Sequence, residues 1–471
     1  MLEVTRVSAF DDDALAHLDA VGVVDALRRG LISRVEVVAA AIARAEAVNP
    51  ELNGIAHRAY DTARARAASS TRYGGFFDGV PTFVKDNVAV AGMPTMEGTD
   101  AWRPRLESAD GDFARAYLAT GLVPLGKTQM SEFGFSASAE HPRLGPVRNP
   151  WGLDRTAGAS SSGAGALVAA GVVPIAHAND GGGSIRIPAS CNGLVGLKPT
   201  RGRLPLDRNV RQMPIRIVAN GVVTRTVRDT AAFYREIEHT QRTPKLPPIG
   251  DVTGPGRTRL RVAVFTDSVK RACGAEVREL TSETAALLER LGHRVEFHDG
   301  PPPVPATFAD DFVLYWALLA MALVRGGRSR FGQTFDRTKC DNLTLGLERH
   351  AARNLHRLPG ALTRLALTRR HTERMMRGYD VVLTPTLTEE PPRIGHLDPT
   401  ADYQQIIGRL EDWVAFTPLQ NVTGDPAISL PLAESAAGLP VGMMFTARAG
   451  EEARLLELAF EIEEAQPFRH L

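Results

Sequence analysis

Two glycine- and serine-rich segments, placed so that Ser160 and Ser184 stand 24 positions apart, constrain the fold of this chain more than any other feature. The first is Gly158-Ala-Ser-Ser-Ser-Gly163, and the second is Asp180-Gly-Gly-Gly-Ser-Ile-Arg186. Consecutive glycines lose much backbone entropy on ordering, so a fold keeps them where a turn needs positive φ or where the chain approaches something closely. We therefore expect both serines to lie where backbone crowds a reacting atom. A serine at the end of such a run is a candidate nucleophile.

The composition fits a globular enzyme with a large core. The chain has 471 residues, of which 44% are hydrophobic and 23% charged, and its formal net charge is +1. This balance gives no reason to expect a nucleic acid or an anionic membrane as a partner.

The three cysteines are odd in number and lack CxxC spacing, so we expect neither a disulfide framework nor a zinc site. The first residues show no leader pattern, and the longest apolar run, 313–324, is too short for a membrane span. We expect a cytoplasmic protein.

The apolar pattern predicts helices first and an α/β sheet after them. Residues 11–48 carry apolar positions at helical spacing. From Gly79 onward, short apolar runs divided by Gly and Pro predict buried strands, with a small-residue helix over 164–170. The expected strands are 80–84, 122–125, 172–176, 194–197, 260–265, 294–297 and 379–383. The other expected helical segments are 275–291, 306–377 and 451–464.

These elements predict five segments within one compact catalytic domain. They are a helical N-terminal layer (1–70), a core segment with both loops (71–240), a Pro- and Gly-rich linker (241–259), two strands with a variable helical segment that forms a substrate pocket (260–378), and a C-terminal return to the core (379–471).

A serine needs a base, because an alkanol is a poor nucleophile until its proton is taken. His177 precedes the second loop, although a core histidine explains it better than a catalytic one. Lys85 interrupts an apolar strand, so burial should lower its pKa and let it act as a base near neutral pH. The alternative is that Lys85 only pairs with Asp86. Neither loop has the Gly-x-Ser-x-Gly pattern of α/β-hydrolases.

The glycine run of the second loop can supply an oxyanion hole. Successive N–H groups of Gly181, Gly182 and Gly183 can point at one atom without obstruction by side chains. Asp180 and Arg186 flank the run and could clamp the loop by an ion pair.

Gly121-Leu-Val-Pro-Leu-Gly-Lys-Thr128 matches the Walker A spacing of a nucleotide-binding P-loop. Its intervening residues are apolar and include a proline, so they predict a buried strand rather than a phosphate-binding loop. The best candidate for a Walker B strand, 262–267, is unconvincing. A P-loop NTPase is therefore an alternative of another class that the context disfavours.

The two loops and several further motifs resemble the amidase signature family over nearly the whole chain. The corresponding stretches are Gly158–Gly163, Asp180–Pro188, Cys191–Thr200, Gly79–Asn87, Gly126–Phe133, Arg148–Trp151, Tyr379–Thr386 and Thr423–Leu430. Three positions depart from the family pattern, Ala159, Ser162 and Gly181, and none removes a catalytic group. The resemblance makes 71–240 the signature core and implies a large mixed, twisted sheet with helices on both sides.

The resemblance also implies the chemistry. Ser184 is the acylated nucleophile, Ser160 is a bridging serine held by a cis peptide bond, and Lys85 is the base. The backbone of Gly181, Gly182, Gly183 and Ser184 forms the oxyanion hole, and neither a metal nor an organic cofactor is needed. We expect an amidase that cleaves a small-molecule amide, with aryl amides and cyclic or linear amide oligomers as candidates. A homodimer is a candidate for the assembly of this chain.

One alternative stays within the family, namely the amidase (A) subunit of a glutamine-dependent tRNA amidotransferase. Its glutamine-binding residues are not recognisable here. Specificity in the family depends on the variable segment, which here carries Phe312, Tyr315, Trp316 and Cys340 as candidate pocket residues. Ordinary core packing would also explain each of them.

Overall fold

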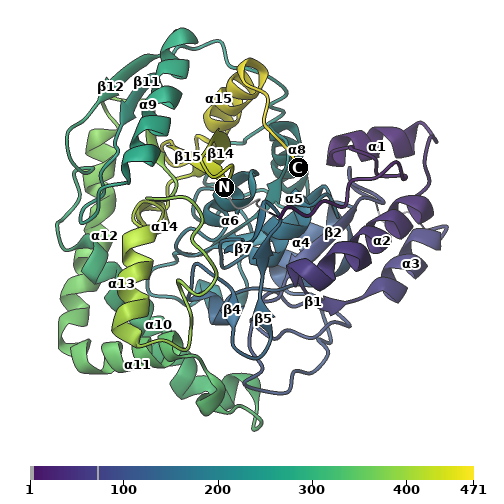
Figure 1. The fold of residues 1–471 in the computed structure, drawn as a ribbon, viewed down its shortest axis with the longest axis horizontal. Helices are drawn as coiled ribbons and strands as arrows, with labels where there is room; N and C mark the ends of the chain where they lie inside the picture. The colour runs from purple at the N-terminus through teal and green to yellow at the C-terminus, as the bar shows by residue number, and fades with distance from the viewer. Residues whose placement is uncertain (1–4, 72–73) are drawn as a thin grey trace.

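The computed structural model describes residues 5–71 and 74–471, and its centre is an eight-stranded mixed sheet (Figure 1). The strand order is β12-β11-β13-β15-β14-β9-β10-β8. β11 runs parallel to β12 and β13, and the other neighbours are antiparallel. The strands are β8 (Ile175–Asp180), β9 (Val195–Lys198), β10 (Ala219–Thr224), β11 (Arg261–Val264), β12 (Arg294–Phe297), β13 (Val381–Pro385), β14 (Ala427–Glu434) and β15 (Pro440–Thr446).

A second sheet of three strands, in the order β1-β3-β2, lies beside β8. Its strands are β1 (Ile55–Arg58), β2 (Pro81–Lys85) and β3 (Val123–Thr128). The Thr82 hydroxyl of β2 donates a hydrogen bond to the Ile175 carbonyl of β8, which brings the two strands together. Lys85 is the last residue of β2, so this contact sets where its side chain enters the core. Short two-stranded ribbons are formed by β4 (Glu140–His141), β5 (Gly145–Pro146), β6 (Arg148–Asn149) and β7 (Gly152–Thr156).

Helices cover both faces of the large sheet. A Cβ on Gly442 of β15 would touch Ser190 of α6, whereas the next residue, Met443, accepts a hydrogen bond from Thr281 of α9. Neighbouring residues on a strand point to opposite faces, so α6 and α9 lie on opposite sides. The helices of the first half are α1 (Ala20–Arg28), α2 (Arg34–Leu52), α3 (Tyr60–Ala68), α4 (Asp112–Ala119), α5 (Ser162–Ala169), α6 (Arg186–Asn192), α7 (Arg208–Arg211) and α8 (Val227–Thr240). The expected α/β class, with a mixed sheet between helices, is confirmed.

The C-terminal half adds a helical layer that reaches the site. Its helices are α9 (Ala275–Arg290), α10 (Phe308–Phe331), α11 (Asn342–Asn354), α12 (Leu358–Met375), α13 (Tyr403–Trp413), α14 (Pro418–Thr423) and α15 (Glu452–Ala465), and the 3-10 turns are η1 (Glu132–Gly134), η2 (Arg337–Lys339) and η3 (Leu355–Arg357). Ala317 and Ala320 of α10 pack with Leu347 of α11 and Ile406 of α13. In Figure 1, α10, α11, α12 and α13 lie at the left and lower left of the molecule, whereas α9 and α15 lie at its top.

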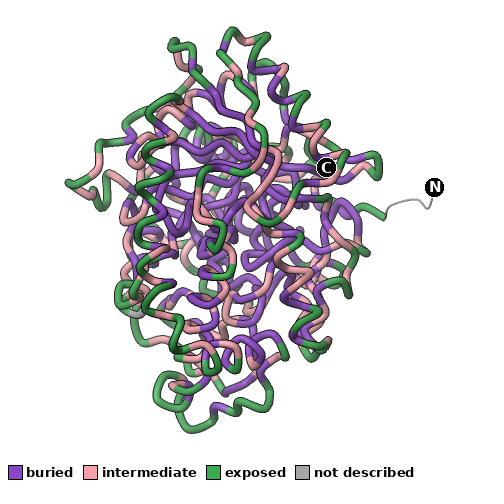
Figure 2. Tube along the Cα trace, turned by 90° about the vertical axis from the view of Figure 1, so that its left-hand side faces the viewer, coloured by how far each residue is buried: buried purple, intermediate pink, exposed green. Residues whose placement is uncertain are grey.

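Burial is complete at the centre of the fold. Every residue of β2, β3, β8, β9 and β10 is buried. Figure 2 shows this core as a continuous buried interior with the exposed segments around it. The stretch 241–260, which contains the expected linker, has neither helix nor strand. Within the described ranges, no helix is both long and apolar enough to cross a membrane.

Candidate active site

Lys85 enters the site from the end of β2 with its side chain fully buried. Its Nζ donates hydrogen bonds to Ser160 Oγ at 2.7 Å, to Asn179 Oδ1 at 2.8 Å and to the Asn179 carbonyl at 3.3 Å. Burial lowers the pKa of Lys85 to about 7, although the carboxylate of Asp180 acts in the opposite direction. The contacts of Nζ are thus to Ser160 and Asn179, and the alternative of a simple pair with Asp86 is not what the structure contains.

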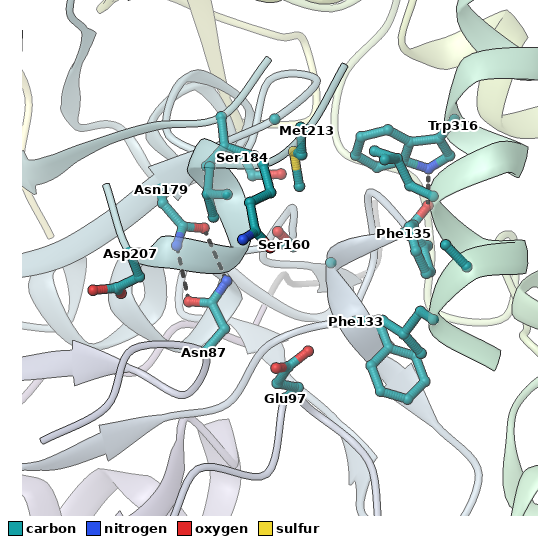
Figure 3. A pocket seen from close by; sticks show the side chains of 18 of the residues that line it. Asn87, Glu97, Phe133, Phe135, Ser160, Asn179, Ser184, Asp207, Met213 and Trp316 are labelled. Carbon is teal, nitrogen blue, oxygen red and sulfur yellow. Dashed lines mark hydrogen bonds between the residues drawn. The ribbon is translucent and has the colours of Figure 1, made fainter. Parts of the chain in front are cut away.

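Ser160 lies in the first loop, immediately after a cis peptide bond that joins it to Ala159. Helix α5 begins at Ser162, and β8 then returns the chain to the second loop. The Ser161 hydroxyl donates to the Ser184 carbonyl at 2.6 Å and thereby ties the two loops together. Ser160 and Ser184 line the same cavity (Figure 3). In the described part of the chain, no hydrogen bond joins their two hydroxyl groups.

The second loop is held by a buried ion pair. Asp180 and Arg186 meet at 2.9 Å with both side chains fully buried. Burial by itself would raise the pKa of Asp180, but the charge and hydrogen bonds of Arg186 lower it to about 2. The Asp180 carboxylate also accepts from the N–H groups of Gly183 (2.8 Å) and Ile185 (3.1 Å). The ion pair expected from the sequence therefore exists and folds the loop around one carboxylate.

Three other backbone N–H groups of the loop are free to bind a ligand within the described residues. The N–H groups of Gly181, Gly182 and Ser184 have no acceptor among the described residues. Gly183 has φ of +137°, and a Cβ added there would lie 2.3 Å from Thr417 Oγ1. Only glycine fits this position, because the conformation and the close neighbour both exclude a side chain.

His177 belongs to the core rather than to the serines. Its Nδ1 accepts a hydrogen bond from the backbone N–H of Lys85 at 3.2 Å, and Nε2 faces Asn220 Oδ1 at 3.4 Å. Burial, with the nearby charge of Lys85, lowers the pKa of His177 to about 3, so the ring is neutral. Its ring also packs against Phe113, with centroids 4.5 Å apart.

The segment with Walker A spacing is a strand. Residues Val123–Thr128 form β3, in which every residue is buried. Lys127, the residue that would reach a phosphate in a P-loop, donates its Nζ to the carbonyl of Val88 at 2.5 Å. The match to the nucleotide-binding motif is therefore accidental.

Two amides at the site were missed by the sequence analysis. Asn179 Nδ2 donates to Asn87 Oδ1 at 2.8 Å, and Asn87 Nδ2 donates to Asn179 Oδ1 at 3.3 Å (Figure 3). Asn87 thus orients the amide of Asn179, whose Oδ1 accepts the hydrogen bond from Lys85. Their positions in the sequence could have identified them as site residues. Asn87 follows Lys85 by two residues, and Asn179 immediately precedes Asp180.

Ser184 lines a cavity of about 360 Å³ and also a smaller one of about 80 Å³. Of the four candidate pocket residues, Trp316 lines both cavities and Phe312 lines the smaller one. Tyr315 is buried and bonds the carbonyl of Ile215. Cys340 packs with a cluster that contains Trp102 and Phe335, as ordinary core packing would have it. Phe133 and Phe135 also line the larger cavity and were not expected from the sequence.

Comparisons with known proteins point in one direction. A family model described as Amidase matches residues 36–456. A Mycobacterium leprae (strain TN) protein named "Putative amidase AmiC" is 67% identical, over 99% of this chain and 99% of its own. The solved structure of a 6-aminohexanoate cyclic dimer hydrolase is 31% identical and has a TM-score of 0.85, covering 97% of this chain and 98% of its own. That of a bacterial aryl acylamidase of the amidase signature family is 26% identical with a TM-score of 0.84, covering 96% of each.

Proposed function

The chain belongs to the amidase family and hydrolyses the carbon–nitrogen bond of carboxylic amides, and we propose that it does so as a stand-alone enzyme through an acyl intermediate on Ser184. In this proposal Ser160 and Lys85 form the proton relay. The observation that carries it is the 2.7 Å contact between Lys85 Nζ and Ser160 Oγ, made by a fully buried amine.

The first half of the reaction forms the acyl-enzyme. Neutral Lys85 accepts the proton of Ser160 while Ser160 takes the proton of Ser184, and Ser184 Oγ attacks the carbonyl carbon. The carbon–nitrogen bond then breaks, and the same relay returns the proton to the leaving nitrogen. In the second half, water gives a proton to the relay and attacks the acyl carbon. The bond from that carbon to Ser184 Oγ then breaks, the relay returns the proton to Ser184, and the carboxylic acid leaves.

Backbone amides stabilise the negative charge on the carbonyl oxygen. We assign this role to the N–H groups of Gly181, Gly182 and Ser184, which are free to donate. The N–H of Gly183, which the sequence also suggested, already serves Asp180 and so shapes the loop instead. Loss of one such donor costs about 3 to 4 kcal/mol of transition-state stabilisation in comparable enzymes.

The substrate class follows the related enzymes. Their names specify a cyclic amide dimer and aryl acylamides, and we propose that this chain acts on aryl amides or on cyclic or linear amide oligomers. The cytoplasmic location, independence from cofactors and the homodimer stay predictions.

A fluorophosphonate probe tests the nucleophile. We expect the probe to label the wild-type protein with loss of activity and to leave Ser184→Ala unlabelled. Ser131→Ala is the matched control, because Ser131 donates to the Ser136 carbonyl and takes no part in the relay. Equal labelling of wild type and Ser184→Ala would sink the assignment of Ser184.

A further inference from the structure

The two cavities at Ser184 differ in size and in chemistry. The larger, of about 360 Å³, is lined by polar side chains such as Asn87 together with the aromatic ring of Phe133. The smaller, of about 80 Å³, is lined mainly by apolar side chains such as Val313 and Leu410, with Glu411 also part of the lining. A group bound at Ser184 can therefore extend into two environments.

Two aromatic residues form the wall between the cavities. Phe135 and Trp316 line both of them, and their rings meet edge to face with centroids 5.4 Å apart. The indole Nε1 of Trp316 also donates to the carbonyl of Phe135 at 3.3 Å (Figure 3). An amide has two substituents that point away from its carbonyl carbon on different sides. When that carbon lies at Ser184, the two rings separate the acyl substituent from the amine substituent, so that each extends into a different cavity.

The position of Ser160 determines which cavity takes the amine and which takes the acyl group. Ser160 lines the larger cavity, whereas its neighbour Ala159 lines the smaller one. Gly181 and Gly182 are divided in the same way. The leaving nitrogen takes its proton through Ser160, so it must be on the side of the larger cavity. We propose that the smaller cavity binds the acyl group and the larger cavity binds the amine, an inference that rests on the proposed function.

The linings then specify the substrate. The acyl cavity, with Ile187, Leu410 and Val414, fits a short apolar chain. The amine cavity presents aromatic rings and, farther out, the ion pair of Glu97 with Arg330 at 2.8 Å. Rings stack on such a surface and polar substituents meet the charged pair. The substrate is an amide of a short carboxylic acid with a bulky amine that carries an aromatic ring.

The order of acyl groups tests this directly. With p-nitroaniline as the constant amine, kcat/KM is expected to fall by about tenfold or more from butyryl to octanoyl amides. With acetyl as the constant acyl group, the change from aniline to naphthylamine is expected to cost less than about threefold. A preference for octanoyl over butyryl amides would overturn the assignment of the acyl cavity.

Two matched variants give the decisive result. Leu410→Trp narrows the smaller cavity, and we expect it to reduce kcat/KM for butyryl relative to acetyl amides by about tenfold without altering the order of amines. Leu323→Trp narrows the larger cavity, and we expect it to disfavour naphthylamides without altering the order of acyl groups. Reversed effects, or no selective effect of either variant, would overturn the inference while amidase activity stands. The absence of all amide cleavage by the wild type would instead contradict the proposed function.

Discussion

At the scale of single residues, Lys85 shows how burial lowers the pKa of an amine. A lysine within an apolar strand cannot keep its charge solvated, and its pKa of about 7 lies well below the usual value of 10.5. This difference corresponds to a cost on the order of 5 kcal/mol for charging the amine inside the fold. The fold tolerates the neutral amine because Ser160 and Asn179 satisfy its hydrogen bonds.

The pH dependence of the reaction tests this state of Lys85. Protonated Lys85 cannot accept a proton, so kcat/KM should rise with pH, reach half its maximum near pH 7 and stay level above pH 8. Lys85→Met keeps the apolar stem without the amine and should lower kcat by about 10²- to 10⁴-fold. Circular dichroism of the variant serves as the check on folding. A folded Lys85→Met enzyme with a normal rate would reduce Lys85 to a structural residue.

The sequence singles out the candidate residues that stand in distinctive local contexts, but not the residues that contact them. Lys85, Ser160 and Ser184 stand in unusual local contexts, namely an interrupted apolar strand and glycine-rich loops. Asn87 and Asn179 are ordinary polar residues that lie 92 positions apart in the sequence. Their pairing depends on how β2 lies against β8. Nothing local in the chain encodes that alignment.

At the scale of elements, the sequence predicts a helix and then a strand between Ser160 and Ser184. Both elements are present, but the strand has other bounds than expected. The helix expected over 164–170 is α5, but the strand expected over 172–176 is β8, which begins at Ile175. An apolar run indicates that residues are buried, not that they form a strand. Val172 and Val173 are buried, but they lie in the segment before β8. β8 also continues beyond 176 and ends at Asp180, whose carboxylate accepts hydrogen bonds from the N–H groups of its own loop.

A pair of glycine substitutions tests how strictly the second loop is shaped. Gly183→Ala forces a Cβ to within 2.3 Å of Thr417 at positive φ, so the loop must shift and kcat should fall by about tenfold or more. Gly408→Ala lies in α13 with nothing within 4 Å of its Cβ, and it should stabilise the fold by up to about 1 kcal/mol. Steady-state kinetics and urea unfolding of both variants measure these effects. Full activity in Gly183→Ala would mean that the loop tolerates displacement.

At the scale of the whole molecule, the C-terminal strands were the part least accessible to sequence reasoning. β14 and β15 insert between β9 and β13, and so join the core segment to the later strands. Neither strand was predicted from the sequence, in which 379–383 is the last expected strand, and the order of strands depends on contacts between residues that are far apart in sequence. The five-segment division of one catalytic domain stays a prediction, although one buried network links three of these segments, 71–240, 241–259 and 379–471.

Arg203 is the centre of that network. Its guanidinium donates to Glu452 of α15 at 2.9 and 2.6 Å, and to Glu238 of α8 and the carbonyl of Pro247 at 2.7 Å each. The side chains of Arg203 and Glu452 are at most 1% exposed. A buried carboxylate is tolerated only while its partner is present, so the network ties α15 and the 241–260 stretch to the core through one cation.

We therefore predict that Arg203→Met lowers the free energy of unfolding by about 3 to 5 kcal/mol, because Glu452 is left with an uncompensated buried charge. Arg369→Met is the matched control, since Arg369 forms an ion pair with Glu373 in which both side chains are about half exposed. That change should stay within about 0.5 kcal/mol. Urea unfolding followed by tryptophan fluorescence measures both. Because Arg203 lies outside the two cavities, the folded fraction of Arg203→Met should keep the wild-type KM. A loss of stability no larger than that of the control would mean that packing alone holds α15 on the core.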